Sequence, residues 1–222
     1  MDLLPGQYCH FTFQGFPART YSPTVPLKGS NQLGTFRLQI QRVEGGKVSP
    51  QLGTGIKAGH PLKIEGPFGS AFHRPGRRER LVLASRGTGF APILAVADAA
   101  LREDRHREIV LVAGARNLAA LYMPSALGRL SSGPGVSVIA TAEEPQNQSS
   151  LVRQGPVAEH VPALNANDIV YVAGGRRLVE SVASLARDVG AEIYFDEFEA
   201  SGSNTTGGGI GGILSMASDW FG

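Results

Sequence analysis

The sequence predicts two folding units in succession: a small antiparallel β-barrel, then an α/β domain with a doubly wound parallel sheet. Three observations predict this architecture. Short strand-like segments separated by Gly, Pro and Asn occupy residues 5–72. Apolar runs that alternate with amphipathic helical segments occupy most of the rest of the chain. Between the two patterns lies HRPGRRER, residues 73–80, a basic segment typical of a linker, whose charges we expect to be solvated.

Composition limits the function classes. With 222 residues, 42% of them apolar, the chain can bury the core of one large domain or two modest ones. Its formal net charge of +2 gives no reason to expect nucleic acid or a membrane surface as a partner. Cys9 is the only cysteine, which excludes an internal disulfide or a cysteine-ligated cluster in this chain. There is no signal segment and no apolar run near the ~20 residues that cross a bilayer, so we expect a soluble, cytoplasmic protein.

The first unit, residues 1–75, is expected to contain short strands. Three segments have the required mixture of β-branched, aromatic and alternating polar residues, bounded by turn residues. They are QYCHFTF (7–13), GTFRLQIQRV (34–43) and HPLKIEG (60–66).

The second unit, residues 79–199, is expected to alternate strands and helices. Its apolar runs are nearly continuous, as in strands that are covered on both faces. The predicted strands are residues 80–85, 108–114, 136–141, 168–174 and 191–195. Apolar stripes at helical spacing predict helices over 91–103 and 176–189, and Gly190 supplies a stop for the second helix.

The tail, residues 200–222, begins as a Gly/Ser/Thr-rich segment that we expect to be flexible. Its last part, ILSMASDWFG (213–222), either docks as one or two helical turns or stays loose. A structureless tail is the default expectation.

The strongest local pattern in the second unit is LVLASRGTGFAPIL, residues 81–94, which reads as strand, tight turn and helix. Such a turn points backbone N–H groups and the positive end of the helix dipole at a ligand, as at dinucleotide phosphates. Gly87 and Gly89 allow close approach, although the usual G-x-G-x-x-G fingerprint is absent. Taken alone, the turn is equally compatible with a tight connection.

A second turn of this kind, with Gly174 and Gly175, lies in VYVAGGRRLVES (170–181). Doubly wound sheets bind ligands beyond the carboxyl ends of their strands, so both turns are expected at one edge. Arg116 follows the second predicted strand at the same edge, where a guanidinium suits a phosphate or an adenine. A single surface arginine is also compatible with a solvated charge.

These segments, taken in order, resemble the ferredoxin-NADP reductase superfamily, and most closely the reductase components that supply electrons to oxygenases. The matching segments are PGQYCHFTFQGFPARTYSPT, GGKVSPQL, GPFG, GTGFAP and AGGRRLVES. The resemblance covers residues 5–198 and implies a flavin-binding barrel followed by a nicotinamide-binding domain.

The resemblance implies a flavin site on the first unit. Arg19 would bind the FAD pyrophosphate, Tyr21 would pack on the isoalloxazine, and Ser22 would hydrogen-bond near flavin N5. The chemistry agrees, since a planar guanidinium suits phosphate, an aromatic face suits a flat heterocycle and a hydroxyl suits a ring nitrogen. The alternative is an arginine at a barrel rim beside a core tyrosine.

The resemblance also implies a second flavin element in GGKVSPQL. Backbone amides around Lys47, Val48 and Ser49 would meet the pyrophosphate as an anion-binding nest. The alternative is a hairpin turn at Gly45 and Gly46.

For the nicotinamide cofactor, the resemblance places Thr88 near the nicotinamide ring, Gly87 and Gly89 along the dinucleotide, and Arg116 at the adenosine end. No acidic residue that would bind ribose follows the second strand, while Arg116, Arg176 and Arg177 suit a 2′-phosphate. We therefore expect NADPH and leave NADH open.

The segment YFDEFEA (194–200) resembles the terminal segment that lies near the flavin, where Glu197 and Phe198 would line the hydride-transfer pocket. Alternatively, Phe198 closes the core after the last strand. Together with Tyr21, Ser22 and Thr88, Phe198 forms the set expected to surround the reacting rings.

Three features depart from the family pattern. Ala173 stands where relatives commonly have cysteine, and Arg86 stands where they usually have glycine. The third departure is that only Met1 to Leu4 precede the PGQY segment, where relatives have about two further strands. We therefore expect the barrel to be incomplete, with an open seam and weakened FAD binding.

The expected function is transfer of hydride from NADPH or NADH to FAD, followed by transfer of single electrons to an acceptor protein. The acceptor would be a ferredoxin, an oxygenase component or a haem protein. The five histidines are scattered without ligand spacing, so no metal site is expected. Two alternatives are a catalytically silent nucleotide- or partner-binding module and an electron-transfer subunit bound permanently to an oxidoreductase.

Overall fold

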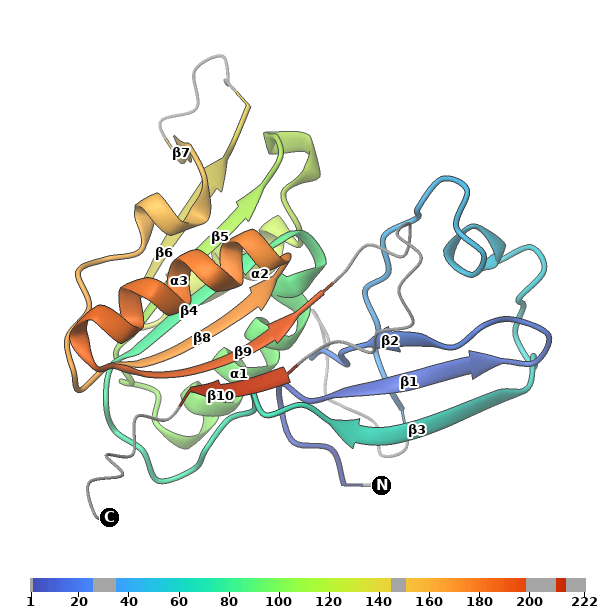
Figure 1. Ribbon diagram of the computed structural model, residues 1–222, viewed down its shortest axis with the longest axis horizontal. Coiled ribbons are helices and arrows are strands. Elements are labelled where there is room, and N and C mark those ends of the chain that lie inside the picture. The colour runs from blue at the N-terminus through green and yellow to red at the C-terminus, as the bar shows by residue number, and fades with distance from the viewer. Residues whose placement is uncertain (1, 26–34, 145–150, 199–210, 215–222) are drawn as a thin grey trace, which may run out of the picture.

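The computed structural model describes residues 2–25, 35–144, 151–198 and the strand 211–214. It contains a small antiparallel sheet and a larger sheet flanked by helices, with the small sheet beside one end of the larger unit (Figure 1). The predicted fold class, a small antiparallel unit followed by a parallel α/β unit, is confirmed.

The small sheet has strands β1 (Tyr8–Phe13), β2 (Arg19–Tyr21) and β3 (Leu62–Phe68) in the order β2-β1-β3. Both pairs are antiparallel, with Phe11 opposite Arg19 on β2 and Ile64 on β3. Phe11 is almost fully buried on one face of β1. The described strands thus form an open sheet whose outer strands β2 and β3 each pair on one side.

One predicted strand is wrong. Residues 35–43, the described part of the segment 34–43, contain no strand. Among the described residues, its backbone bond to this part of the chain runs from Thr24 N–H, just after β2, to the Arg37 carbonyl at 2.9 Å, and the Phe36 ring packs edge-on against Phe11 at 6.1 Å. A strand requires a ladder of such bonds on at least one side, and strand-like composition does not supply a neighbour to pair with.

The larger sheet has the order β10-β9-β8-β4-β5-β6-β7. Six of its strands are parallel to one another: β4 (Leu81–Arg86), β5 (Ile109–Ala115), β6 (Val136–Ala142), β7 (Val152–Gln154), β8 (Ile169–Gly174) and β9 (Glu192–Glu197). The strand β10 (Gly211–Leu214) is antiparallel to β9. The chain runs outwards from β4 in both directions, so the point where the strand order reverses lies at β4.

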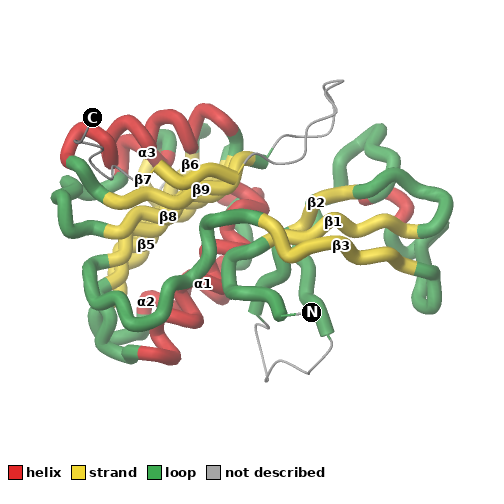
Figure 2. Tube along the Cα trace, turned by 60° about the horizontal axis from the view of Figure 1, so that its bottom comes forward, coloured by secondary structure: helices red, strands yellow, loops and turns green. Residues whose placement is uncertain are grey.

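Helices cover both faces of the larger sheet (Figure 2). On one face, α1 (Phe90–Glu103) and α2 (Pro124–Ser131) pack against Leu83, Leu111 and Tyr171. On the other face, α3 (Arg176–Val189) packs against Val82, Val112 and Val170. The two sets come from alternate positions on the same strands, which explains the nearly continuous apolar runs.

The five predicted parallel strands and two predicted helices are confirmed, with ends that differ by one or two residues. Gly190 ends α3 in the left-handed region at φ 73°, as expected of a glycine stop. Sequence reasoning missed α2 and the three-residue β7, which are too short to show a periodic pattern. It also missed β10. The expectation of a structureless tail is therefore wrong for residues 211–214. The rest of the tail lies outside the described residues.

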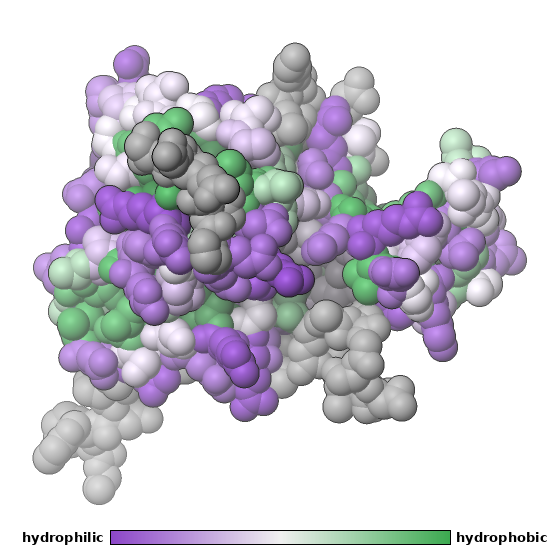
Figure 3. All heavy atoms as spheres, turned by 90° about the horizontal axis from the view of Figure 1, so that it is seen from above, coloured by the Kyte–Doolittle hydropathy of each residue, from purple (hydrophilic) through white to green (hydrophobic). Residues whose placement is uncertain are grey.

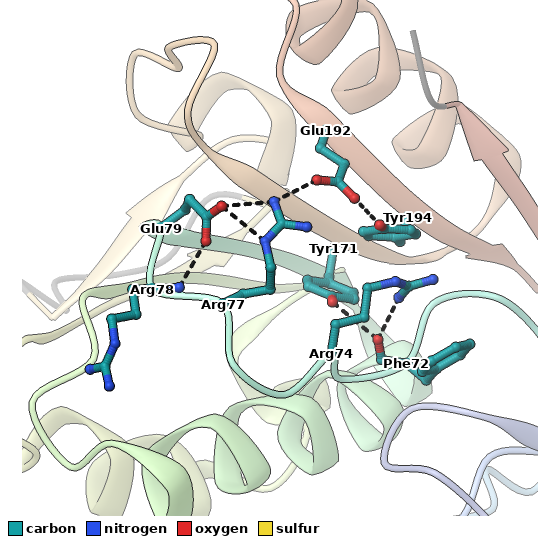
Figure 4. Close-up of polar contacts among 8 residues, drawn as sticks. All are labelled: Phe72, Arg74, Arg77, Arg78, Glu79, Tyr171, Glu192 and Tyr194. Carbon is teal, nitrogen blue, oxygen red and sulfur yellow. Dashed lines mark hydrogen bonds and ion pairs between the residues drawn. The ribbon is translucent and has the colours of Figure 1, made fainter. Parts of the chain in front are cut away.

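The linker is not the solvated connector that its composition suggested. The Arg74 guanidinium lies 3.5 Å from the centroid of the Tyr194 ring and donates hydrogen bonds to the carbonyls of Phe72 and Ser70 (Figure 4). Tyr171 donates from its hydroxyl to the same Phe72 carbonyl at 3.0 Å and stacks on Tyr194. The linker is therefore bonded to the sheet that follows it.

Two further arginines of the linker pair with acids at the amino ends of the strands. Arg77 binds Glu79 and Glu192, in each case with a 2.8 Å contact (Figure 4). Arg80 forms a two-pronged pair with Asp168 at 2.9 and 2.7 Å, and Asp168 is only 1% exposed. The composition of the linker did not predict these ion pairs because two of the partners, Asp168 and Glu192, lie 88 and 115 residues further along the chain.

The described helices include none that is long and apolar enough to cross a bilayer. The face of the molecule seen in Figure 3 is mostly hydrophilic, with smaller hydrophobic patches between.

A buried carboxyl group lies where the two sheets meet. Asp196 on β9 is 2% exposed, and neither of its oxygens has a hydrogen-bond partner among the residues that the structure describes. Tyr8 of the small sheet and Gly69 are its neighbours, since a Cβ atom on Gly69 would lie 3.3 Å from Asp196 Oδ1. Burial raises the pKa of Asp196 to about 7, because the ionised form loses its hydration. Its negative charge in turn contributes to the raised pKa of Tyr8, after burial.

We predict that Asp196→Asn removes a pH-dependent loss of stability. The pKa of Asp196 in the folded protein is raised above its unfolded value near 3.9. Below about pH 4 the carboxyl group is protonated in both states and does not lower the free energy of unfolding. The cost grows as pH rises from about 4 to about 7, where it reaches roughly 4 kcal/mol. Urea unfolding of both proteins between pH 5 and pH 8 measures it.

The free energy of unfolding of Asp196→Asn minus that of the wild-type protein should increase by about 3 kcal/mol from pH 5 to pH 8. Asp98→Asn, at a partly exposed carboxylate on α1, is the matched control and should show no such gain. If the free energies of unfolding of Asp196→Asn and wild type differ by the same amount across this pH range, the raised pKa of Asp196 is contradicted.

Candidate active site between the two sheets

A small cavity lies between the two sheets and contains the residues expected around the reacting rings. Its lining consists of Thr20, Tyr21, Ser22, Gln39, Thr88, Ala91 and Phe198. Tyr21 and Ser22 come from β2 and the residue after it, Thr88 from the turn between β4 and α1, and Phe198 from the end of β9. The fold therefore brings together four side chains that are up to 177 positions apart in the sequence.

The cavity has a volume of about 40 Å³, which is little more than the room for one water molecule. A flat ring therefore enters only after a lining side chain moves. Phe198 is one of the lining side chains; it is half-buried and packs against the α1 cluster.

Two buried hydroxyl groups in the segment that follows β2 have no hydrogen-bond partner among the described residues. Ser22 and Thr24 are each 7% exposed, and Ser22 Oγ and Thr24 Oγ1 are both unpaired. An unpaired buried hydroxyl costs about 1–3 kcal/mol, so a ligand heteroatom that bonds to it recovers that cost. Ser22 thus fits its expected place near a flavin nitrogen. Thr24 was missed by sequence reasoning, although its position two residues from Ser22 in an extended segment puts it on the same side.

Arg19 and Tyr21 share one face of β2, because side chains two positions apart on a strand point to the same face. The Tyr21 ring lies 5.8 Å from the Phe11 ring, so one part of it is in the core and the rest lines the cavity. Burial raises the pKa of the Tyr21 hydroxyl, and the nearby Arg19 partly offsets this rise. Arg19 donates to the Ala18 carbonyl at 2.8 Å, and the structure describes no acidic partner for it. This guanidinium is available for an anion.

The second predicted flavin element lies apart from this cavity. Lys47 is exposed, the Val48 side chain is buried, and Ser49 Oγ accepts a hydrogen bond from Val43 N–H at 3.0 Å. Gly46 N–H donates to the Val43 carbonyl and forms a turn, but no described strands flank this turn as in the hairpin of the alternative interpretation. Among the described residues, no hydrogen bond joins Lys47, Val48 or Ser49 to Arg19.

The two glycine turns meet at the carboxyl edge of the sheet, as expected. Gly87 has φ +58°, a left-handed conformation that favours glycine, and the turn leads directly into α1. A Cβ atom on Gly89 would lie 2.2 Å from the Ala173 carbonyl oxygen, so only glycine fits between β4 and β8 there. Gly174 and Gly175 follow on the adjacent strand and lead into α3. Both turns thus lie at the carboxyl ends of adjacent strands, the edge at which doubly wound sheets bind ligands.

Glu197 is not brought to the cavity with Phe198. Successive side chains on β9 point to opposite faces, and Phe198 packs with the α1 cluster, while Phe195 packs with the α3 cluster. Glu197 therefore lies on the α3 face, opposite Gly174 in the strand register. Its role as a cofactor ligand stays a prediction.

Arg86 and Arg116 both have carboxylate partners that sequence reasoning missed. Arg86 binds Glu143 through Nε at 2.6 Å and Nη2 at 2.9 Å. Arg116 binds Glu144, which also accepts a hydrogen bond from Asn117 Nδ2 at 3.0 Å. Glu143 and Glu144 follow β6, the third strand of the unit. The sequence analysis considered a ribose-binding acidic residue only after the second strand, β5. Within the described residues, no cluster of three His, Cys, Asp or Glu side chains would hold a metal ion.

Comparison with known families identifies both units. The model of the oxidoreductase FAD-binding domain matches residues 1–73, and that of the oxidoreductase NAD-binding domain matches residues 83–184.

Curated relatives are reductase components of bacterial oxygenases. The chain is 32% identical over 189 residues to reductase component 1 of terephthalate 1,2-dioxygenase from Comamonas sp., which covers 83% of this chain and 55% of that protein. It is 26% identical over 217 residues to the ferredoxin–NAD(P)+ reductase component of a naphthalene 1,2-dioxygenase system from Pseudomonas putida, over 90% of this chain and 62% of that one. The chain thus spans less than two thirds of the length of these relatives.

Solved structures share the fold. A ferredoxin reductase of carbazole 1,9a-dioxygenase superposes with a TM-score of 0.72 at 24% identity, over 89% of this chain and 60% of that one. A cytochrome P450 reductase from Amycolatopsis superposes with a TM-score of 0.76 at 24% identity, over 89% and 62%. With the two domain models in the expected order and the cavity at their junction, the chain belongs to the ferredoxin-NADP reductase superfamily.

Proposed function

We propose that the chain is an NAD(P)H-dependent flavin oxidoreductase that reduces FAD and passes single electrons to an acceptor protein. One observation carries this proposal: Tyr21 and Ser22 of the FAD-binding unit line the same cavity as Thr88 and Phe198 of the NAD-binding unit. Such a junction is where two flat rings from two cofactors would meet. The unit boundaries 1–75 and 79–199 are part of the proposal.

The chain's own residues would bind and orient the cofactors. Arg19 has no described acidic partner and would take a phosphate, the Tyr21 face would carry the flavin ring, and the unpaired Ser22 hydroxyl would bond a ring nitrogen. FAD, when bound, supplies the two-electron acceptor that no side chain here provides.

The nucleotide would lie along the two glycine turns. The N–H groups of Gly87, Thr88 and Gly89 and the positive end of α1, which begins directly after this turn, would bind the pyrophosphate. Because hydride transfer needs the two rings about 3–3.5 Å apart, the main task of the protein is to hold them there and exclude water. Phe198 closes the cavity against water until a ring replaces it.

The acceptor would be a ferredoxin, an oxygenase component or a haem protein. The named relatives support this class, because they are reductase components of oxygenase systems.

We predict that the purified full chain, mixed with FAD, retains flavin absorbance after gel filtration and loses it anaerobically on addition of NADH or NADPH. Protein without FAD is the control for direct nucleotide effects. Binding of pyridine nucleotide without any bleaching would contradict the proposal and favour a silent nucleotide-binding module.

We predict that Ser22→Ala slows anaerobic flavin bleaching about three- to tenfold, the effect of losing one net hydrogen bond. Stopped-flow absorbance at saturating nucleotide measures the rate, and fluorescence titration of FAD shows whether the flavin still binds. Ser132→Ala, at an exposed hydroxyl on the far end of α2, is the matched control. Equal rates in both variants would show that the Ser22 hydroxyl does not contact the reacting ring.

A further inference from the structure

We infer that the outer edge of the small sheet is a self-association surface, at which β3 pairs antiparallel with β3 of a second copy of this chain. The pairing is centred on Ile64. The inference does not depend on the proposed function, because the cavity between the two units is lined from β2, at the opposite edge of the small sheet.

The strand β3 has a neighbour on one side. Among the described residues it pairs with β1 and with no other strand, and it is the outer strand of the small sheet (Figure 1, Figure 2). Most of its residues are exposed, including Leu62 at 42% and Phe68 at 39%. An uncovered strand edge of this length is a template for pairing with another chain.

The register shows which backbone groups of β3 point outwards. Gln14 N–H donates to the Pro61 carbonyl at 3.0 Å, so these two residues form a hydrogen-bonded pair. Bonded and non-bonded positions alternate along an antiparallel pair, so the N–H and C=O groups of Leu62 and Ile64 point away from β1. Two copies related by a twofold axis at Ile64 therefore exchange hydrogen bonds through these groups.

The charges on β3 select this register. Pairing centred on Ile64 places Lys63 of one copy opposite Glu65 of the other, and the twofold axis makes this contact occur twice. Pairing centred on Lys63 or on Glu65 would place like charges directly opposite each other, which is destabilising. The two side chains share a face of the strand, contact each other at 2.8 Å, and are 69% and 48% exposed. Both are thus accessible to a second copy.

The apolar face of the small sheet also matches itself. Ile64 lies opposite Phe11, which is almost fully buried on that face. In the inferred dimer the two Ile64 side chains, each half-buried in one chain, meet on the same face and lose contact with water. The two three-stranded sheets then form one continuous sheet.

The same charges that favour this pairing discourage others. Charged residues on an edge strand normally prevent pairing with unrelated chains. On β3 a cation and an acid flank one apolar residue, so a copy of the same strand is a partner that matches both charges in antiparallel orientation. This self-complementarity points to a second copy as the occupant of the edge.

The test measures the sedimentation coefficient of the full chain by analytical ultracentrifugation over a micromolar range of concentration. We expect the wild-type chain to be in equilibrium between monomer and dimer. Lys63→Glu and Glu65→Lys should each weaken dimerisation at least about tenfold, because each replaces two attractive contacts with two repulsive ones. Arg105→Glu, at an exposed residue between α1 and β5, is the matched control and should leave dimerisation unchanged.

Mixing the two charge variants tests the contact itself. In a mixed dimer each acid at positions 63 and 65 of one chain faces a lysine of the other, so the mixture should dimerise at least as tightly as wild type. Both sites are exposed, so we expect both variants to fold, and circular dichroism checks this. In wild-type protein a carbodiimide should also join Lys63 of one copy to Glu65 of the other, a result that requires no variant.

Three results would overturn the inference. The first is a wild-type chain that stays monomeric, which would leave the edge to a different occupant. The second is a dimer that neither charge variant weakens, because another surface would then hold it together. The third is a pair of folded variants that do not regain dimerisation on mixing. None of these results bears on flavin reduction, which the bleaching experiment tests separately.

Discussion

The position of the small sheet depends on how the linker is bonded to the larger one. The Phe72 carbonyl accepts hydrogen bonds from both Arg74 and Tyr171, and the Arg74 guanidinium covers the Tyr194 ring. These contacts fix the chain just before it enters β4, and just after it leaves the small sheet. A cavity formed by residues of both units requires such a fixed connection, because small movements at a junction separate groups that must be within a few ångströms.

Charged groups are divided between the two edges of the parallel sheet. At the amino edge, Arg77 and Arg80 pair with Glu192 and Asp168, which stabilises the connection to the linker. At the carboxyl edge, glycine turns leave backbone N–H groups facing outwards, and the charged pairs there are exposed. The Arg80–Asp168 pair is largely buried, whereas the ion pairs at the carboxyl edge are exposed and individually weak. The two edges of the sheet therefore differ in the burial of their charged groups.

The junction of the two units also contains polar groups that the protein leaves unpaired. Among the described residues, the hydroxyls of Ser22 and Thr24 and the carboxyl of Asp196 are buried without hydrogen-bond partners, as are side-chain atoms of Ser70, Ser85, Arg107 and Thr141. Each costs stability, and native proteins keep few such groups. A ring bound in the cavity would satisfy the Ser22 hydroxyl, for which the described residues provide no partner.

The sequence by itself determined the class of each unit, the five long parallel strands, both long helices and the two glycine turns, because these follow from local periodicity and from residues with special backbone freedom. It also indicated Tyr21, Ser22, Thr88 and Phe198. Only the tertiary structure decided which of these share a cavity, that residues 35–43 pair too little to form a strand, and that the arginines of the linker and of the carboxyl edge have acidic partners. The physical reason is that pairing, burial and ion-pair geometry depend on which distant segments come together, and no local pattern in the chain records that.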